Sequence, residues 1–285
     1  GGLGNQLFQY FLSNKLQKKF NKNVFYYDLR NSYRTNHNSD LENLFYLNLR
    51  KYNIENLNLI LRFIFLSPIS LKTYRYLFNK FKIKIFSNFY FDSINTNINL
   101  NDINFNNNIL VFFGTWHKLI NQYEFLPSCK NLKYKEDINI TKKLNLNKKF
   151  ISLHVRRGDY INYRASKFHG NLDISYYLKG INFLRSKFGN LSVFLFSDDP
   201  KWVQNNLVNL IPNSTVISSG NFSAESEFII MSKANYFILS NSTYSWLSAF
   251  FSKNEDKFII IPKFWFKSYQ VTSEYIFKDW QYKII

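Results

Sequence analysis

The residues best suited to chemistry lie in KFISLHVRRGDY, residues 149–160. An apolar run there leads into a turn that carries His154, Arg156, Arg157 and Asp159. The planar fork of arginine bonds phosphate oxygens in pairs and keeps its charge, so two arginines on one turn indicate a phosphate ligand. The competing interpretation is an exposed basic turn without a ligand, because short motifs recur by chance.

A second polar cluster is FSDDPKW, residues 196–202, in which Asp198 and Asp199 follow an apolar run and Pro200 suits a first helical turn. One carboxylate is expected to cap that helix, and the other to accept two N–H bonds from a guanine edge. A metal-binding acidic pair is the alternative. The nearby arginines disfavour it, because they already neutralise phosphate.

A third cluster, SNSTYSW, places Ser240, Asn241, Ser242 and Thr243 where a strand gives way to a helix. Free backbone N–H groups and the helix dipole favour an anion at such a point, and the Ser242 or Thr243 hydroxyl would add a hydrogen bond. The alternative is a simple N-cap. The two interpretations are compatible, because a cap exposes the same donors.

The chain opens on GGLGNQ, which places Gly2, Gly4, Asn5 and Gln6 at the start of a predicted helix over residues 3–20. Glycines there would let the backbone approach a phosphate closely. A tight turn into the helix, with no ligand, is the alternative.

The elements of the second half alternate between strand and helix, which predicts parallel βαβ units with helices on both faces of the sheet. The polar clusters follow strands, and the carboxyl ends of such strands meet at one crevice. The expected strands are 150–155, 191–196, 215–218, 236–239 and 258–261, and the expected helices are 173–188, 200–210, 224–234 and 244–252.

The first half is less regular. After the helix over 3–20, the pattern predicts a strand over 24–27, a helical stretch from Leu41 to about Phe81, and short strands over 84–91 and 109–113. A Lys- and Asn-rich connection then runs from about residue 129 to 149. The sequence therefore predicts an α/β protein of two domains, 1–148 and 149–285.

The chain has 285 residues and a formal net charge of +18, with basic residues spread along its length. Such a charge favours an anionic partner, whether a sugar nucleotide, a membrane surface or nucleic acid. Cys129 is the only cysteine, so a reducing compartment is expected. The four histidines lack metal-ligand spacing, and we expect no metal.

The most apolar run, residues 57–69, is interrupted by Arg62 and Pro68 and is shorter than the roughly 20 residues of a membrane span. It is interpreted as a buried helix. We expect a cytoplasmic protein, with peripheral contact at the membrane face as a further hypothesis. Because the chain begins without methionine, the presence of a strand, signal or anchor before Gly1 is an open question.

Five motifs occur together in an order and spacing that resemble the α-1,2-fucosyltransferases, glycosyltransferase family 11. They are GGLGNQLFQY, HVRRGDY, FSDDPKW, IIMSKANYFILSNSTYSW and FIIIPKFWF, and they span nearly the whole chain. The resemblance implies a GT-B architecture, two Rossmann-like domains facing across a cleft. It also implies metal-independent, inverting transfer of L-fucose from GDP-fucose to the 2-hydroxyl of a terminal galactoside, without a cofactor. The acceptor would be a galactose-terminated glycan, lipid-linked as in bacterial relatives.

By this resemblance the C-terminal domain binds the donor and the N-terminal domain the acceptor. Arg156 and Asp159 take the catalytic roles, with Asp159 either the general base or a salt-bridge brace for the arginines. Asp28 and His117 lie on the acceptor side. The implied donor-binding residues are Gly2, Gly4, Asn5, Gln6, His154, Arg156, Arg157, Asp198, Asp199, Ser240, Asn241, Ser242 and Thr243.

Three other functions stay open. The first is another nucleotide-sugar transferase on the same fold. The second is a basic nucleic-acid-binding protein, which would need a contiguous basic stripe and would bind less tightly as salt rises; we do not expect nucleic acid as a partner. The third is an inactive sugar-binding module, because a competent base cannot be recognised from sequence.

Overall fold

The computed structural model describes residues 2–21, 23–26, 41–47, 73, 76, 89–91, 111–113, 135, 144, 146–161, 169–267, 269–270, 276 and 280–285. The chain divides into two compact units, one of residues 1–42 with 47–131 and one of residues 43–46 with 132–285. The domain limits predicted from the sequence differ from this division by residues 43–46 and 132–148.

The second unit is built on a six-stranded sheet in which every pairing is parallel. Its order, β10-β7-β6-β3-β4-β5, is the 3-2-1-4-5-6 order of a Rossmann sheet when the strands are counted along the chain. The point where the strand order reverses therefore lies between β3 and β6. This confirms the predicted α/β class. The strands are β3 (Phe150–Val155), β4 (Ser192–Ser197), β5 (Ser214–Val216), β6 (Tyr236–Ile238), β7 (Phe258–Ile261) and β10 (Gln281–Ile284).

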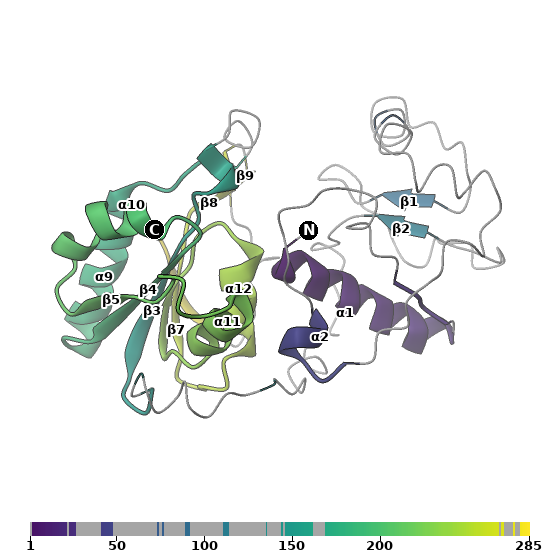
Figure 1. The fold of residues 1–285 in the computed structure, drawn as a ribbon, viewed down its shortest axis with the longest axis horizontal. Coiled ribbons are helices and arrows are strands. Elements are labelled where there is room, and N and C mark those ends of the chain that lie inside the picture. The colour runs from purple at the N-terminus through teal and green to yellow at the C-terminus, as the bar shows by residue number, and fades with distance from the viewer. Residues whose placement is uncertain are drawn as a thin grey trace. The chain divides into compact units, whose positions relative to one another are not determined.

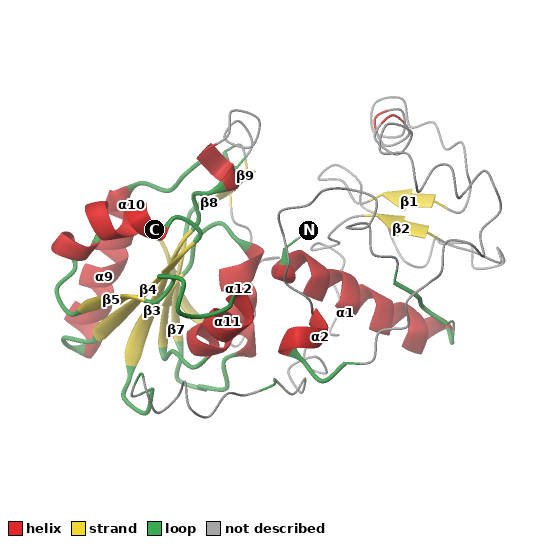
Figure 2. Ribbon diagram, viewed as in Figure 1, coloured by secondary structure: helices red, strands yellow, loops and turns green. Residues whose placement is uncertain are grey.

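Four helices connect these strands, as the sequence predicts. Helices α9 and α10 lie on one side of the sheet and α11 and α12 on the other (Figures 1 and 2). Each of these four crossovers joins parallel strands, a connection that usually carries a helix on a face of the sheet. The helices are α9 (Ile174–Phe188), α10 (Pro200–Asn206), which the short 3-10 helix η5 (Val208–Leu210) follows, α11 (Ala224–Ser232) and α12 (Thr243–Phe251).

The face of the sheet covered by α9 and α10 holds a continuous apolar core. Ile151, Leu153 and Val155 of β3 belong to it, together with residues of both helices. Because side chains alternate along a strand, Ser152 and His154 point to the opposite face, toward α11 and α12. The alternation thus places His154 near the start of α12, where its ring lies 5.5 Å from that of Tyr244.

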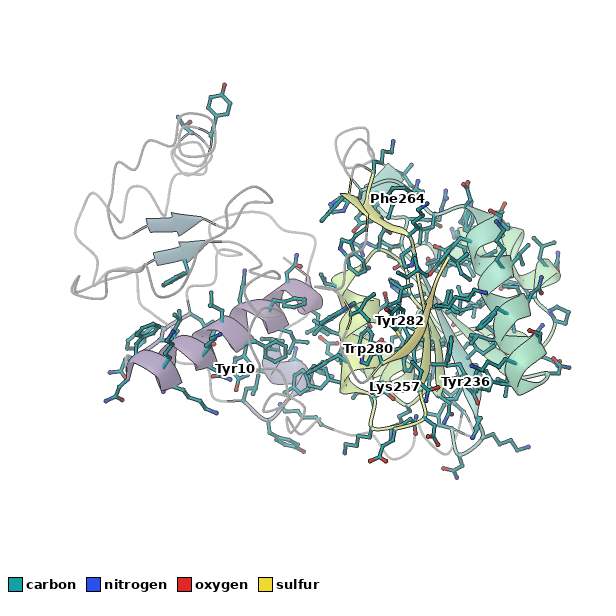
Figure 3. All side chains as sticks on the ribbon, turned by 180° about the vertical axis from the view of Figure 1, so that it is seen from behind. Tyr10, Tyr236, Lys257, Phe264, Trp280 and Tyr282 are labelled. Atoms are coloured by element: carbon teal, nitrogen blue, oxygen red, sulfur yellow. The ribbon has the colours of Figure 1, made fainter. Side chains whose placement is uncertain are left out.

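The sequence did not predict three strands near the C-terminus. Strands β8 (Phe264–Phe266) and β9 (Tyr269–Gln270) form an antiparallel pair, and β10 closes one edge of the main sheet. The four residues of β10, QYKI, alternate between polar and apolar as strand residues do, but all four are exposed. Tyr282 lies on this edge strand (Figure 3).

The predicted helix from Leu41 is wrong in length, because α2 (Leu41–Leu44) ends after four residues. The chain leaves the helix at Phe45, whose ring is fully buried against Phe228 of α11 and Phe251 of α12. Burial in the second unit thus overrides the helical periodicity. Beyond residue 47, the rest of this predicted helix lies almost wholly outside the described residues.

The first unit contains α1 (Leu3–Phe20), with the bounds that the sequence predicts. It also contains β1 (Phe89–Phe91) and β2 (Val111–Phe113), a parallel pair inside the two predicted strand regions. Over 23–26, only Tyr26 takes part in a bridge. Within the part of the chain that the structure describes, no helix is long and apolar enough to cross a membrane.

Candidate active site

The site begins where β3 and β6 end side by side at the centre of the sheet. Nδ1 of His154 lies 2.6 Å from Oγ of Ser240, and both side chains are buried. Burial lowers the pKa of His154 to about 4, so the imidazole is neutral near pH 7. His154 therefore ties the ends of the two strands together rather than offering a positive charge to a ligand.

The Asp198 carboxylate holds the arginine turn from the neighbouring strand, β4. Oδ1 accepts the backbone N–H of Arg157 at 2.8 Å, and Oδ2 lies 2.9 Å from Nη1 of Arg156. This carboxylate packs so closely on Gly158 that a Cβ atom there would lie 2.6 Å from Oδ2. A side chain at residue 158 would therefore force this carboxylate to shift.

Arg157 is held by the second aspartate and by a tryptophan. Its guanidinium carbon lies 4.0 Å from the centre of the Trp202 ring, and Nε lies 3.5 Å from Oδ2 of Asp199. Asp199 Oδ1 accepts the Trp202 N–H at 3.2 Å and so caps α10. The predicted cap is confirmed, and Asp199 provides it.

Both arginine side chains stay partly exposed at this edge of the sheet, 22% for Arg156 and 20% for Arg157. The structure gives Asp198 and Asp199 protein partners, so a guanine contact would use their remaining lone pairs. That contact stays a prediction.

Ser242 and Thr243 begin α12, which starts beside the arginine turn in the second unit. The Ser242 hydroxyl accepts the Tyr244 N–H at 3.3 Å, which confirms the predicted N-cap. Ser240, Asn241 and Ser242 are all buried, with 0%, 2% and 7% of their surface exposed, whereas Thr243 is half-buried. Within the predicted SNST cluster, Thr243 is therefore the residue best placed to meet a ligand, and the buried residues hold the loop.

The remaining predicted site residues are placed only in part. Asp159 opens the short 3-10 helix η4 (Asp159–Ile161), directly after the arginine turn, and its side chain lies outside the described part. Its role as base or brace stays open. Asp28 and His117 also lie outside the described residues.

The glycine-rich start of the chain belongs to the first unit. Gly2 is the N-cap residue of α1, and Gly4, Asn5 and Gln6 form its first turn, where the Gln6 N–H donates to the Gly2 carbonyl at 3.1 Å. The turn into a helix is confirmed. A contact of these residues with the donor stays a prediction.

Sequence reasoning gave no role to Glu227, which takes part in a polar chain near the ends of β4 and β5. The Ser218 hydroxyl donates to Oε2 of Glu227 at 2.6 Å and accepts the Ser197 N–H at 3.0 Å. Burial raises the pKa of Glu227 to about 7. The signal that could have found it is a carboxylate in the first turn of an otherwise apolar helix.

Chemically, two guanidinium groups and a capped helix start on one sheet edge suit a diphosphate. Arginine bonds phosphate oxygens in pairs, and the helix start adds backbone N–H groups and the positive end of its dipole. Among the described residues, no three His, Cys, Asp or Glu side chains are grouped so as to hold a metal ion.

Comparisons with known proteins identify relatives of this chain. The chain is 42% identical to the O-antigen biosynthesis glycosyltransferase WbnK of Escherichia coli over 139 residues, 45% of each chain. It is 32% identical to an alpha-1,2-colitosyltransferase of Escherichia coli over 173 residues, 57% of this chain and 58% of that protein. The chain thus spans about half the length of the curated relatives it matches.

Among solved structures, the chain is similar to POFUT1 in complex with GDP, at 17% identity and a TM-score of 0.33 over 51% of both chains. It is likewise similar to POFUT1 in complex with GDP-fucose, at 17% identity and a TM-score of 0.32, over 50% of this chain and 51% of that one. The family model of glycosyl transferase family 11 matches residues 1–284. With nearly its whole length matched, and with the HVRRGDY and SNSTYSW motifs at the ends of the two strands that flank the switch point of its parallel sheet, the chain belongs to glycosyl transferase family 11.

Proposed function

We propose that this protein transfers L-fucose from GDP-fucose to the 2-hydroxyl of a terminal galactoside, with inversion at the fucose carbon. The observation that carries the proposal is the position of Arg156 and Arg157. They extend from the strand end at the switch point of a Rossmann sheet, where nucleotides bind, in a member of glycosyl transferase family 11.

In this reaction the bond between the fucose anomeric carbon and the β-phosphate oxygen breaks, and a bond to the acceptor oxygen forms. The acceptor hydroxyl gives up its proton to a base, for which Asp159 is the candidate in sequence. GDP leaves with the electron pair, so negative charge grows on the β-phosphate. Arg156 and Arg157, already held by Asp198 and Asp199, would meet that charge with little reorganisation.

The same proposal assigns the other contacts. Ser242 and Thr243 at the start of α12 would reach the β-phosphate, and Asp198 or Asp199 would face the guanine. The acceptor is a galactose-terminated glycan, in line with the O-antigen biosynthesis named for one relative. A lipid-linked acceptor, peripheral contact with the cytoplasmic face of a membrane, and independence from metal ions complete the proposal.

A donor panel tests the proposal. The protein is incubated with GDP-fucose, GDP-mannose or a UDP-sugar, each with lactose or another β-galactoside, in the presence of a chelator, and nucleotide release is measured. We expect GDP release from GDP-fucose that depends on the acceptor. Release from no donor, together with no thermal stabilisation by GDP, would reject the function. Turnover of a UDP-sugar instead would identify another transferase of this fold.

A second candidate differs only in the sugar. One relative is named an alpha-1,2-colitosyltransferase, and colitose is fucose without its 3-hydroxyl. GDP-colitose belongs in the same panel, since a site that hydrogen-bonds the 3-hydroxyl would reject the deoxy sugar strongly. A higher kcat/KM for GDP-colitose than for GDP-fucose would favour this candidate.

A further inference from the structure

Tyr160, the last residue of the HVRRGDY motif, lies between the arginine turn and the start of α12. It is buried in η4, with 7% of its surface exposed. The guanidinium carbon of Arg156 lies 5.3 Å from the centre of its ring, within the range of a cation–π contact. Its hydroxyl donates to the backbone carbonyl of Asn241 at 3.1 Å. One side chain thus touches an arginine and the residue before the N-cap of α12.

A closed set of contacts fixes the Tyr160 ring in place. The ring stacks on His169, with centres 4.3 Å apart and planes 11° apart. Nδ2 of Asn241 in turn lies 3.1 Å from the carbonyl oxygens of His169 and Gly170 and 3.3 Å from that of Trp265. Tyr160, His169 and Asn241 therefore hold one another. This leaves the ring little freedom to move independently of the α12 start.

Arg156 is held from two directions by these contacts. The Asp198 carboxylate fixes its Nη1 at 2.9 Å, and the guanidinium carbon lies 5.3 Å from the centre of the Tyr160 ring. The carboxylate belongs to the β4 side of the sheet, whereas Tyr160 is bonded to the loop between β6 and α12. Tyr160 thus connects Arg156 with the loop that precedes α12.

We infer that Tyr160 is a positioning residue, which sets the distance between the Arg156 guanidinium and the first turn of α12 so that both meet the terminal phosphate of a nucleoside diphosphate. The inference rests on the proposed function for its ligand, and it needs only a diphosphate leaving group, whichever sugar is transferred. It predicts that loss of the Tyr160 hydroxyl weakens binding most for a nucleotide whose terminal phosphate carries its full negative charge.

GDP, GMP and the sugar nucleotide separate this role from a merely structural one. GDP carries the terminal charge that develops as the sugar leaves, GDP-fucose carries less of it, and GMP lacks the β-phosphate. A misplaced guanidinium should therefore weaken GDP binding and transition-state stabilisation together. It should have little effect on GMP binding or on the KM for the donor. A loss of overall structure would weaken all of them.

The test is Tyr160→Phe, which removes the hydroxyl and keeps the ring. We expect kcat to fall about 10-fold to 100-fold, as for small displacements of a reacting group, with the GDP dissociation constant rising by a similar factor. GMP affinity and the donor KM should stay within about threefold of wild type, as expected when only transition-state interactions are lost. Unchanged kcat and GDP affinity, or an equal loss of GDP and GMP binding, would overturn the inference.

Tyr176→Phe is the matched control. Tyr176 is also buried, and its hydroxyl donates to a backbone carbonyl of the same connection, that of Leu239, at 2.6 Å. None of the contacts described for Tyr176 is with an arginine, and it plays no part in the proposed site. We expect this variant to lose stability without losing kcat. A kcat loss equal to that of Tyr160→Phe would overturn the inference, because the effect would then follow from any lost hydroxyl in this loop.

Two further measurements keep the test decisive. If Tyr160→Phe lacks a cooperative thermal transition, Asn241→Ser, which keeps the backbone acceptor and loses the Nδ2 bonds, is measured in the same GDP and GMP assays with the same expected split. If the wild type binds GDP but transfers no sugar, the proposed function fails while the GDP and GMP comparison still tests Tyr160. A wild type that binds neither nucleotide would overturn both.

Discussion

The Asp198 carboxylate fills the space that a side chain on Gly158 would need, since a Cβ atom there would lie 2.6 Å from Oδ2 and 3.0 Å from Cγ. The same carboxylate pairs with Arg156 at 2.9 Å. A short side chain at residue 158 therefore has to push the aspartate away from the arginine.

The first prediction concerns that packing. Gly158→Ala should keep the fold and reduce kcat by about 10-fold or more, because a catalytic group moved by a fraction of an ångström loses much of its effect. Steady-state kinetics and a thermal melt measure the two quantities. In an Asp198→Ala background, Gly158→Ala should reduce kcat little further, because the carboxylate that it would displace is already absent. Additive losses in the double variant would contradict this reading of the glycine.

The second prediction separates charge from geometry at Arg156. Arg156→Lys keeps a positive charge and loses the planar fork, so turnover should fall strongly, by about 100-fold, while the protein stays folded. Arg185→Lys is the control, because Arg185 donates to the backbone carbonyl of Leu191 at 3.2 Å, away from the site. Unchanged kinetics in Arg156→Lys would contradict the role of Arg156 in donor binding.

The third prediction is a dependence of stability on pH that originates at Glu227. Burial raises its pKa from 4.5 to about 7, so the folded protein binds a proton that the unfolded chain has lost in that interval. The contribution of Glu227 to stability is then fully present below about pH 4.5 and declines as pH rises to about 7. Above about pH 7 it is constant.

Urea unfolding of the wild type and of Glu227→Gln across this interval measures the effect. The free energy of unfolding of the wild type should fall relative to that of the variant by roughly 3 kcal/mol between the two limits. Glu225→Gln, on the same helical turn, is the control. A difference between wild type and Glu227→Gln that does not change with pH would show that Glu227 keeps its ordinary pKa.

The fourth prediction concerns the short segment of residues 43–46 that belongs to the second unit. Phe45→Ala should destabilise that unit by about 3 to 5 kcal/mol, because it empties a fully buried site between Phe228 and Phe251. Tyr46→Ala is the control, since Tyr46 is 69% exposed. Equal stability of the two variants, measured by thermal or denaturant unfolding, would show that Phe45 does not contribute to the core of the second unit.

Much of the second unit is predictable from sequence because its helices and strands alternate and its polar clusters follow strands. Strands β3 and β7 have their predicted bounds, and the caps at Asp199 and Ser242 follow from residue type and position. Local patterns suffice where a strand is buried on both faces. They fail at β10, an edge strand of four residues that are all exposed.

The parts that sequence could not supply are contacts between distant residues. Nothing in the local pattern pairs Asp198 with Arg156, although both lie in motifs that stand out by themselves. Tyr160 and Trp202 sit beside the predicted site residues, yet their contacts with the arginines depend on the turn that brings them together. The position of Phe45 in the second unit likewise depends on the fold of a chain segment far away in sequence.

The most direct measurement is the structure of the product. After incubation with GDP-fucose and a β-galactoside, the purified product is analysed by nuclear magnetic resonance, which reports both the anomeric configuration of the new bond and the galactose oxygen that carries it. We expect one fucose, joined through an α bond to the 2-oxygen of the terminal galactose. A β bond, a bond to another oxygen, or free fucose as the sole product would contradict the proposed reaction.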